Sequence, residues 1–281
     1  MKIIRRILQM RSVVSDLRKK GKTIGFVPTM GALHDGHISL VTRAKKENDA
    51  AVVSIFVNPA QFGPKEDFRR YPRNLKKDAK MCGKAGADFI FVPEAKEIYP
   101  EGYAAYVNVE GDLAKVLEAA SRPGHFRGVA TVVAKLFNIV LPDKAYFGEK
   151  DYQQLLVIKK MAEDLDLPVR IVPCPTVRER DGLAISSRNA YLSPEQRKTA
   201  LVISRTLKKA VHAARDHGFT DAKKLSDSIR SAILSQPGIK LDYAAIRGGT
   251  TLEPVKRIEK GCVILIAAKV GKTRLIDNMR I

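Results

Sequence analysis

Short strand-like runs alternate with helical patterns along residues 2–172, and this alternation limits the possible folds more than any other feature. The clearest run, residues 50–57, is the kind of apolar segment that forms a central parallel strand covered on both faces. The other strand-like runs are residues 2–5, 24–28, 88–93, 145–148 and 169–172. Helical patterns occupy residues 7–20, 37–44, 74–86, 127–140 and 151–165, with a short helix expected at 112–120. This order predicts an α/β fold, a Rossmann-like doubly wound parallel sheet with right-handed crossovers.

The alternation ends after residues 173–175. Two helical patterns follow at residues 193–217 and 220–235, and strand-like runs at 240–246, 262–268 and 273–276 close the chain. We therefore predict a Rossmann-like domain at residues 1–176 and a smaller C-terminal α+β domain at residues 177–281. No flexible glycine- and serine-rich linker separates them, which favours close packing of the two parts over the active site.

Composition points to a soluble protein of the cytoplasm. Hydrophobic residues make up 45% of 281, and no apolar run approaches the roughly 20 residues that a membrane span needs. The basic N-terminus is not followed by the apolar stretch of a signal peptide. Cys82, Cys174 and Cys262 are few, widely spaced and odd in number, as expected of reduced cysteines in a cytosolic protein.

The net charge of +20, from 50 Lys and Arg against 30 Asp and Glu, is high for a metabolic enzyme. Such a field attracts polyanions, so nucleic acid is a candidate partner. The basic residues are scattered over helical patterns, however, and no zinc-finger spacing, RNA-binding aromatic signature or basic tail occurs. Solvated helix faces are the preferred explanation, which makes a nucleic-acid partner unlikely; we find no physical account of the excess itself.

Residues 23–37 form a strand, a glycine-containing turn and the start of a helix. Pro28 is expected to stop strand pairing, and Gly31 and Gly36 allow a sharp turn. His34 and His37 lie where the helix begins, and a helix N-terminus offers unpaired N–H groups and a positive dipole that suit a phosphate. Two histidines could also bind a metal, but no ligand set is completed nearby, so no metal site is expected. Either one alone could be an ordinary polar loop residue.

Three further segments carry polar groups at strand ends or in loops. Asn58 and Gln61 follow residues 50–57, and ligands bind at the carboxyl ends of strands in doubly wound sheets. Lys150 lies where a strand meets a helix that Asp151 could cap, with Gln154 one turn later. A glycine-led loop holds two serines and an arginine: Ser186, Ser187 and Arg188. Asn58 and Gln61 are suited to binding a hydroxyl or carboxylate, but they could instead be solvent-exposed loop residues. The other two segments could be a cap and a simple turn, but they offer donors for phosphate.

Motifs of several other enzyme classes are missing from the sequence. It contains no P-loop, no G-x-S-x-G nucleophile elbow, no zincin motif and no complete thiol-protease set. Covalent catalysis through the enzyme therefore has no visible candidate. The polar residues are of types that bind phosphate and stabilise charge.

Five segments in order resemble one family: residues 28–37, 54–63, 122–129, 146–154 and 182–193. The chain is similar over essentially its whole length to the pantoate–β-alanine ligases, members of the nucleotidyltransferases with HIGH-type motifs that also include class I aminoacyl-tRNA synthetases. The resemblance implies ATP-dependent condensation of (R)-pantoate with β-alanine through a pantoyl adenylate, in pantothenate biosynthesis. It also implies ATP and Mg²⁺ as substrate and cofactor, a homodimer, and closure of the smaller domain over the site.

The resemblance assigns roles to individual residues. The catalytic residues it implies are His34, His37 and Lys150. The ATP-binding residues are Met30, Gly31, Ala32, Leu33, His34, Asp35, Gly36, His37, Gly148, Glu149, Lys150, Asp151, Val177, Ile185, Ser186, Ser187 and Arg188. The residues for pantoate or β-alanine are Asn58, Gln61, Tyr71, Arg127 and Gln154. The family generally carries Met at the position of Ile185, which weakens the transfer of that one contact.

Two other functions remain open at this point. The first is another adenylyltransferase of the same superfamily with a different acid or a phosphorylated acceptor. Gln61 and Gln154, in place of a basic pocket for an acceptor phosphate, argue against it. The second is a nucleic-acid-binding protein on an inherited nucleotide fold, indicated only by the charge of +20.

Overall fold

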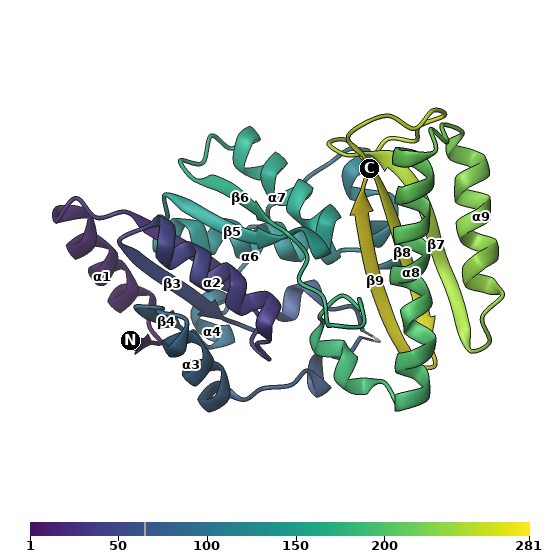
Figure 1. Ribbon diagram of the computed structural model, residues 1–281. Coiled ribbons are helices and arrows are strands. Elements are labelled where there is room, and N and C mark those ends of the chain that lie inside the picture. The colour runs from purple at the N-terminus through teal and green to yellow at the C-terminus, as the bar shows by residue number, and fades with distance from the viewer. Residues whose placement is uncertain (65) are drawn as a thin grey trace. The chain divides into compact units, whose positions relative to one another are not determined.

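The computed structural model describes residues 1–64 and 66–281. Its residues group into two compact units (Figure 1). The first unit contains Met1–Glu149 and Gln154–Pro175, and the second contains Lys150–Gln153 and Thr176–Ile281. The single boundary predicted after residue 176 does not account for residues 150–153, which group with the C-terminal part.

The first unit is built on a six-stranded sheet in which all neighbouring strands are parallel. In spatial order the strands are β1 (Lys2–Ile4), β4 (Phe89–Phe91), β3 (Ala50–Ile55), β2 (Ile24–Thr29), β5 (Lys144–Gly148) and β6 (Arg170–Cys174). From β2 the chain builds outward through β3 and β4, and later returns to add β5 and β6 on the other side. The direction of winding therefore changes between β2 and β5, and ligands of such sheets bind at the carboxyl ends of the strands at this point.

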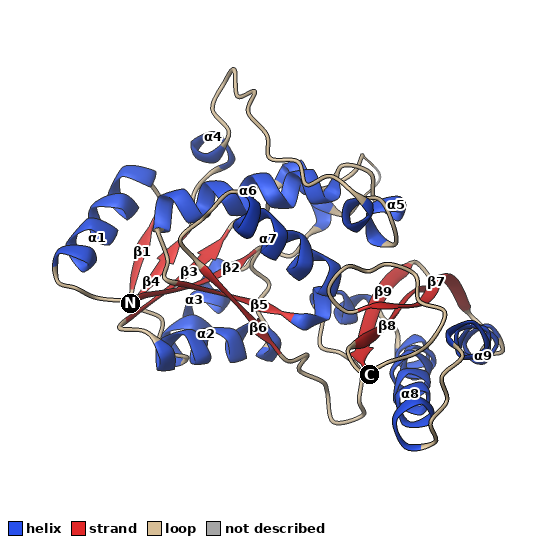
Figure 2. Ribbon diagram, turned by 90° about the horizontal axis from the view of Figure 1, so that it is seen from above, coloured by secondary structure: helices blue, strands red, loops and turns tan. Residues whose placement is uncertain are grey.

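Helices cover both faces of this sheet (Figure 2). Figure 2 shows α1 (Ile7–Lys19) and α6 (His125–Val140) on one face and α2 (Asp35–Glu47) and α3 (Leu75–Lys84) on the other. The remaining helical segments before residue 165 are η1 (Pro59–Gln61), η2 (Phe68–Arg70), α4 (Ala95–Ile98), η3 (Asp112–Ala114), α5 (Glu118–Ser121), η4 (Glu149–Asp151) and α7 (Tyr152–Asp164). The predicted α/β fold with a doubly wound parallel sheet is confirmed.

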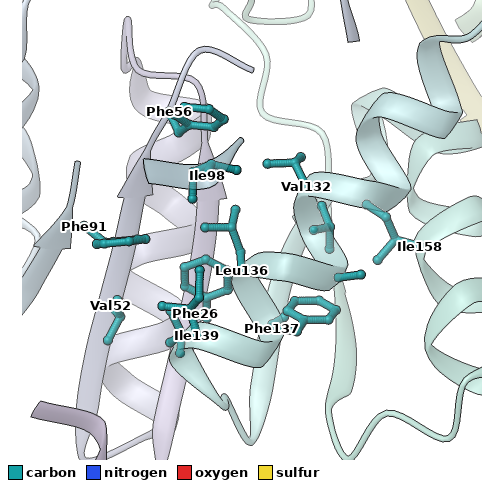
Figure 3. Close-up of a cluster of buried hydrophobic side chains, with 14 of the residues drawn as sticks. Phe26, Val52, Phe56, Phe91, Ile98, Val132, Leu136, Phe137, Ile139 and Ile158 are labelled. Carbon is teal, nitrogen blue, oxygen red and sulfur yellow. The ribbon is translucent and has the colours of Figure 1, made fainter. Parts of the chain in front are cut away.

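The main core of the first unit lies between the sheet and α6 (Figure 3). Phe26 and Val52 of the central strands are fully buried, and Phe137 of α6 meets the ring of Phe26 edge-on with 6.3 Å between centroids. Because α6 is apolar on nearly every side, it is buried almost completely.

Pro28 does not end β2, and the expectation that it stops pairing is wrong. It pairs with Ser54 of β3. The carbonyl of the next residue, Thr29, accepts from Phe56 N at 3.0 Å, so the main-chain groups of Thr29 face β3. Successive residues of a strand point their main-chain groups to opposite sides, so the nitrogen and the carbonyl of Pro28 face β5. Among the described residues, pairing between β2 and β5 ends at Phe26. The missing N–H of Pro28 therefore costs no ladder bond.

Two helix predictions also need correction. Residues 112–120 do not form one short helix; η3 and α5 are separate because Leu117 has φ of +54°, a left-handed conformation that interrupts a helix. The helix expected to begin at residue 37 begins at Asp35, with His34 as its N-cap.

The second unit has a three-stranded antiparallel sheet, β7 (Ile239–Gly248), β8 (Cys262–Val270) and β9 (Thr273–Arg280), with β8 in the middle. Two long helices, α8 (Pro194–Asp216) and α9 (Ala222–Leu234), pack against it, and η5 (Ser187–Tyr191) precedes α8. Ser193 caps α8 through a reciprocal capping box with Gln196, which explains why the helix begins there. The predicted α+β composition of this part is therefore observed. No helix in the described part of the chain is long and apolar enough to cross a membrane.

Candidate active site

The two histidines share the first turn of α2. His34 is the N-cap residue in extended conformation, and His37 N donates to the carbonyl of His34 at 2.8 Å. Their rings are tilted by 38°, with 4.0 Å between centroids. A Cβ on Gly36 would lie 3.0 Å from the His34 ring. The ring can lie this close to the main chain of residue 36 because glycine has no side chain. The helix N-terminus and two imidazoles therefore lie together, as the motif predicts.

The turn that leads into α2 is held from α3. Asp78 is 2% exposed, and its carboxylate accepts from Ala32 N at 3.0 Å and Leu33 N at 2.9 Å. Those amides are oriented by the left-handed conformation of Gly31 and Ala32, with φ of +82° and +51°. No sequence motif indicates this role of Asp78, because Asp78 lies far along the chain from the turn.

Asp78→Asn is expected to lower the free energy of unfolding by about 2 kcal/mol, because one carboxylate oxygen becomes a donor that faces an N–H in a buried site. Chemical denaturation monitored by circular dichroism measures this loss. Asp16→Asn is the matched control, since Asp16 is exposed on α1. Equal unfolding midpoints for the two variants would show that Asp78 does not hold the turn.

Gln61 lies in η1, directly after β3, and contacts the segment after β2. Gln61 is 8% exposed, and its Nε2 is 3.0 Å from Met30 Sδ. Its Oε1 accepts from Asn58 Nδ2 at 3.1 Å. The structure thus brings together Met30, which is predicted to bind ATP, and Asn58 and Gln61, which are predicted to bind substrate. The hydrogen bonds described for Asn58 lie within the protein, so a direct contact with substrate stays a prediction.

Helix α6 packs on η1 without any intervening side chain. A Cβ on Gly128 would lie 2.1 Å from the carbonyl oxygen of Ala60 and 2.7 Å from Gln61 N. Asn58 Nδ2 also donates to the Gly128 carbonyl at 3.0 Å. Only glycine permits this approach, so the position of Gln61 depends on residue 128.

The main chain of Gln61 is held by a second group of side chains. His125 Nδ1 lies 2.8 Å from the Gln61 carbonyl oxygen, and Arg122 Nη1 lies 3.0 Å from His125 Nε2. Arg122 also forms a bidentate ion pair with Glu66 at 2.7 and 2.8 Å. Burial lowers the pKa of His125 to about 4, and the charge of Arg122 acts in the same direction. The ring is therefore neutral at pH 7, with Nδ1 donating to the carbonyl and Nε2 accepting from the guanidinium.

Stability should fall between pH 6.5 and about 4 because of His125. Its pKa is depressed in the folded state, so the unfolded chain binds more protons in this interval and unfolding becomes easier as the pH falls. The contribution is up to about 3 kcal/mol. Urea unfolding of the wild type and of His125→Gln from pH 7 to pH 4.5 measures it, since glutamine cannot titrate. Parallel stability curves for the two proteins would contradict the assignment.

The other residues assigned to pantoate or β-alanine lie elsewhere in the first unit. Tyr71 is buried, with its ring 6.0 Å from that of Phe62. Arg127 is exposed on α6, with its guanidinium 4.0 Å from the centre of the Tyr106 ring. Gln154 is partly buried in α7. Their roles in substrate binding remain predictions.

In the second unit, a short hairpin carries several of the residues assigned to ATP. Ile185 N donates to the Val177 carbonyl at 3.0 Å, and Ser186 caps η5 by accepting from Arg188 N at 3.3 Å. The hairpin is tied to β9 because Arg178 forms a bidentate ion pair, at 2.7 and 2.9 Å, with the buried Asp277. This ion pair holds the first arm of the hairpin, and the second arm, which pairs with it, leads into Ser186 and Ser187; no sequence motif indicates the ion pair.

Lys150 is also anchored within the second unit. Its carbonyl accepts from Asn278 Nδ2 at 2.9 Å, while its ammonium lies 3.6 Å from Asp151 Oδ1. The side chain is 19% exposed. Gly148, at the end of β5, and Glu149, the first residue of η4, belong to the first unit. The division between the units thus falls within a motif that sequence alone treats as continuous.

Comparison with known proteins identifies the family. The family model described as pantoate-beta-alanine ligase matches residues 2–280. The pantothenate synthetase of Koribacter versatilis is 52% identical over 279 residues, covering 99% of this chain and 95% of that protein. The crystal structure of the Thermus thermophilus pantothenate synthetase has a TM-score of 0.94 at 47% identity and covers 100% of this chain and 99% of its own.

A third relative was crystallised with ligands. The pantoate-beta-alanine ligase of Francisella tularensis, in complex with beta-gamma ATP and beta-alanine, has a TM-score of 0.83 at 39% identity, with 100% of this chain and 97% of that chain covered. The resemblance recognised in five sequence segments is confirmed. Since the family model and these relatives extend over nearly the whole chain, the protein belongs to the pantoate–β-alanine ligase family.

Proposed function

We propose that this protein condenses (R)-pantoate with β-alanine to give pantothenate, with ATP cleaved to AMP and pyrophosphate. The observation that carries the proposal is the pair His34 and His37 on the first turn of α2, where a helix N-terminus and two imidazoles converge. The nucleotide and β-alanine found with the Francisella relative support two of the three substrates.

In the first half-reaction, a carboxylate oxygen of pantoate attacks the α-phosphorus of ATP. The bond from that phosphorus to the bridging oxygen breaks, and pyrophosphate leaves with the electron pair. Negative charge grows on the α-phosphate oxygens during this step. His34, His37 and the first amides of α2 would stabilise that charge by hydrogen bonds and by the helix dipole.

Other residues would hold the nucleotide and the leaving group. Lys150 and Arg188 supply positive charge for the polyphosphate, and the serine hydroxyls supply neutral donors. The residues assigned to the rest of the nucleotide are Met30, Gly31, Ala32, Leu33, Asp35, Gly36, Gly148, Glu149, Asp151, Val177 and Ile185.

Mg²⁺ would accompany ATP. The described residues contain no group of three or more His, Cys, Asp or Glu side chains suited to a metal, and phosphate oxygens and water commonly hold Mg²⁺ in ATP sites.

In the second half-reaction, the amine of β-alanine attacks the acyl carbon of pantoyl adenylate. AMP leaves with the electrons of the acyl–oxygen bond, and the new amide loses a proton to solvent. Gln61 and Gln154 would orient pantoate, with Tyr71 at the pantoate or β-alanine pocket and Arg127 in the flap over it. Because water would destroy the adenylate, we propose that the smaller C-terminal domain closes during turnover.

Pyrophosphate release from ATP and Mg²⁺, measured before β-alanine is added, tests this proposal. We expect no release without pantoate, a burst of about one turnover with pantoate, and continuous release once β-alanine is present. Failure to respond to pantoate would exclude the ligase activity. A panel of other acids and salt-dependent binding to nucleic acid would then test the two alternatives.

Gln61→Ala is expected to raise the KM for pantoate by about 10–100-fold, because hydrogen bonds to a charged group contribute about 1.5–3 kcal/mol. ATP affinity should change less than about twofold, since Gln61 is assigned to the acid. Steady-state kinetics and calorimetric titration with ATP measure the two effects. Gln9→Ala, on the exposed side of α1, is the matched control. Equal losses for pantoate and ATP would indicate a general folding defect instead.

We also propose a homodimer in the cytoplasm. The dimer is suggested by the family resemblance, and light scattering on the purified protein tests it. The buried, unpaired thiols of Cys82, Cys174 and Cys262 support a reducing compartment.

A further inference from the structure

The amide of Asn58 has a single possible orientation. Its Oδ1 lies 3.2 Å from Ala60 N, and its Nδ2 lies 3.0 Å from the Gly128 carbonyl oxygen. A main-chain N–H can only donate and a main-chain carbonyl can only accept, so these two neighbours identify which atom of the Asn58 amide is oxygen. Because Asn58 is 1% exposed, no water can replace these partners without opening the structure.

The orientation of Asn58 determines the orientation of Gln61. Asn58 Nδ2 is a donor, so the atom of Gln61 that faces it at 3.1 Å must be the acceptor Oε1. The Nε2 of Gln61 then lies on the side of Met30 Sδ, at 3.0 Å. A thioether is a weak acceptor and takes at most one of the two hydrogens on Nε2. Gln61 therefore keeps at least one N–H of Nε2 that neither Asn58 nor Met30 takes up, while its Oε1 already accepts from Asn58.

Tyr99 completes this arrangement from the residue after α4. Its hydroxyl donates to Asn58 Oδ1 at 2.8 Å, the shortest of the hydrogen bonds described for Asn58. The Tyr99 ring is packed against Tyr103, with 5.0 Å between centroids, and Phe56, with 6.3 Å. Burial raises the pKa of Tyr99, so its hydroxyl keeps the proton that it donates.

We propose that Tyr99 is a positioning residue which, through Asn58, holds the Gln61 amide so that it presents N–H to an acceptor oxygen of the acid substrate. This inference rests on the proposed function. The carboxylate of the acid substrate can only accept hydrogen bonds. If the Gln61 amide were turned the other way, its carbonyl oxygen would face the carboxylate and the two would repel each other. The arrangement therefore favours substrates that present a carboxylate or hydroxyl oxygen at this point. His125 fixes the main chain of the same residue, which leaves the side-chain amide as the part that Tyr99 controls.

Tyr99→Phe is the test, because it removes one oxygen and keeps the ring that packs against Phe56 and Tyr103. The KM for pantoate should rise by about 5–30-fold, the loss expected when a buried acceptor loses its donor. The KM for ATP should stay within about twofold. Tyr103→Phe is the matched control, since Tyr103 packs beside Tyr99 and its hydroxyl is not among the partners described for Asn58. A pantoate KM equal to that of the wild type would overturn the proposal.

A double-mutant cycle separates positioning from a general structural effect. In a Gln61→Ala background, Tyr99→Phe should change the KM for pantoate less than about twofold, because the amide that it orients is gone. An undiminished effect in that background would mean that Tyr99 acts by another route, which contradicts the inference.

Asn58→Asp provides a second test that does not depend on the Tyr99 variant. A carboxylate cannot donate to Gln61 Oε1, so the Gln61 amide should turn over and the pantoate KM should rise more than in Tyr99→Phe. A smaller rise than in Tyr99→Phe would also overturn the proposal.

A wild-type enzyme that does not respond to pantoate would refute the proposed function. A responsive wild type with unaffected variants would refute only the role of Tyr99.

Discussion

His37→Ala is expected to slow formation of pantoyl adenylate by about 10²–10³-fold, comparable to the loss of one donor from an oxyanion hole. His37 lies on the first turn of α2, with its ring 4.0 Å from that of His34. Alanine retains the helix and its dipole but removes the imidazole that would donate to the α-phosphate as charge develops. Rapid-quench measurement of pyrophosphate in a single turnover reports this step directly.

His212→Ala is the matched control for this variant, because His212 is exposed on α8 in the second unit. It should keep the wild-type single-turnover rate. Calorimetric titration of His37→Ala with ATP would establish that the nucleotide site is still formed. A near-normal rate of adenylate formation in His37→Ala would remove this residue from catalysis, whatever the effect on binding.

Gly128→Ala is expected to lower the free energy of unfolding by about 3 kcal/mol, at the upper end for an overpacked site. The new Cβ would lie 2.1 Å from the Ala60 carbonyl oxygen, which is main chain and cannot rotate away. Either α6 or η1 must shift. Because η1 carries Gln61, the KM for pantoate should rise at least as much as in Gln61→Ala. Urea unfolding and steady-state kinetics measure the two effects.

Gly83→Ala is the control for a glycine in a helix. Its Cβ would approach no atom closer than 3.7 Å, so alanine in α3 should leave stability unchanged or raise it by up to about 1 kcal/mol. A Gly128→Ala protein as stable as Gly83→Ala would show that the close contact between α6 and η1 is not maintained in solution.

The family and the main secondary structure could be read from the sequence, because both depend on local patterns. Strand-like and helical runs follow from the spacing of apolar residues within a few positions, and all six predicted strands of the parallel sheet are present. The motif of His34 and His37 is local as well, since a turn and a helix N-terminus involve neighbouring residues. The catalytic and binding roles assigned by resemblance remain predictions, those of His34 and His37 included.

The supports of the site became visible only in the tertiary structure. Asp78 holds a turn from another helix, Tyr99 reaches Asn58 from the residue after α4, and Gly128 is required because two main chains meet. Each depends on a partner that no periodic pattern specifies, since hydrogen bonds and close contacts between distant segments form only after the strands have assembled in their spatial order. The continuation of β2 through Pro28 has the same origin. The missing N–H of proline costs a hydrogen bond only if a neighbouring strand pairs on the side that this N–H would face, and β5 does not pair there. Local sequence patterns therefore sufficed for the elements and the family, while the packing of distant segments decided how Gln61 and the turn before α2 are held.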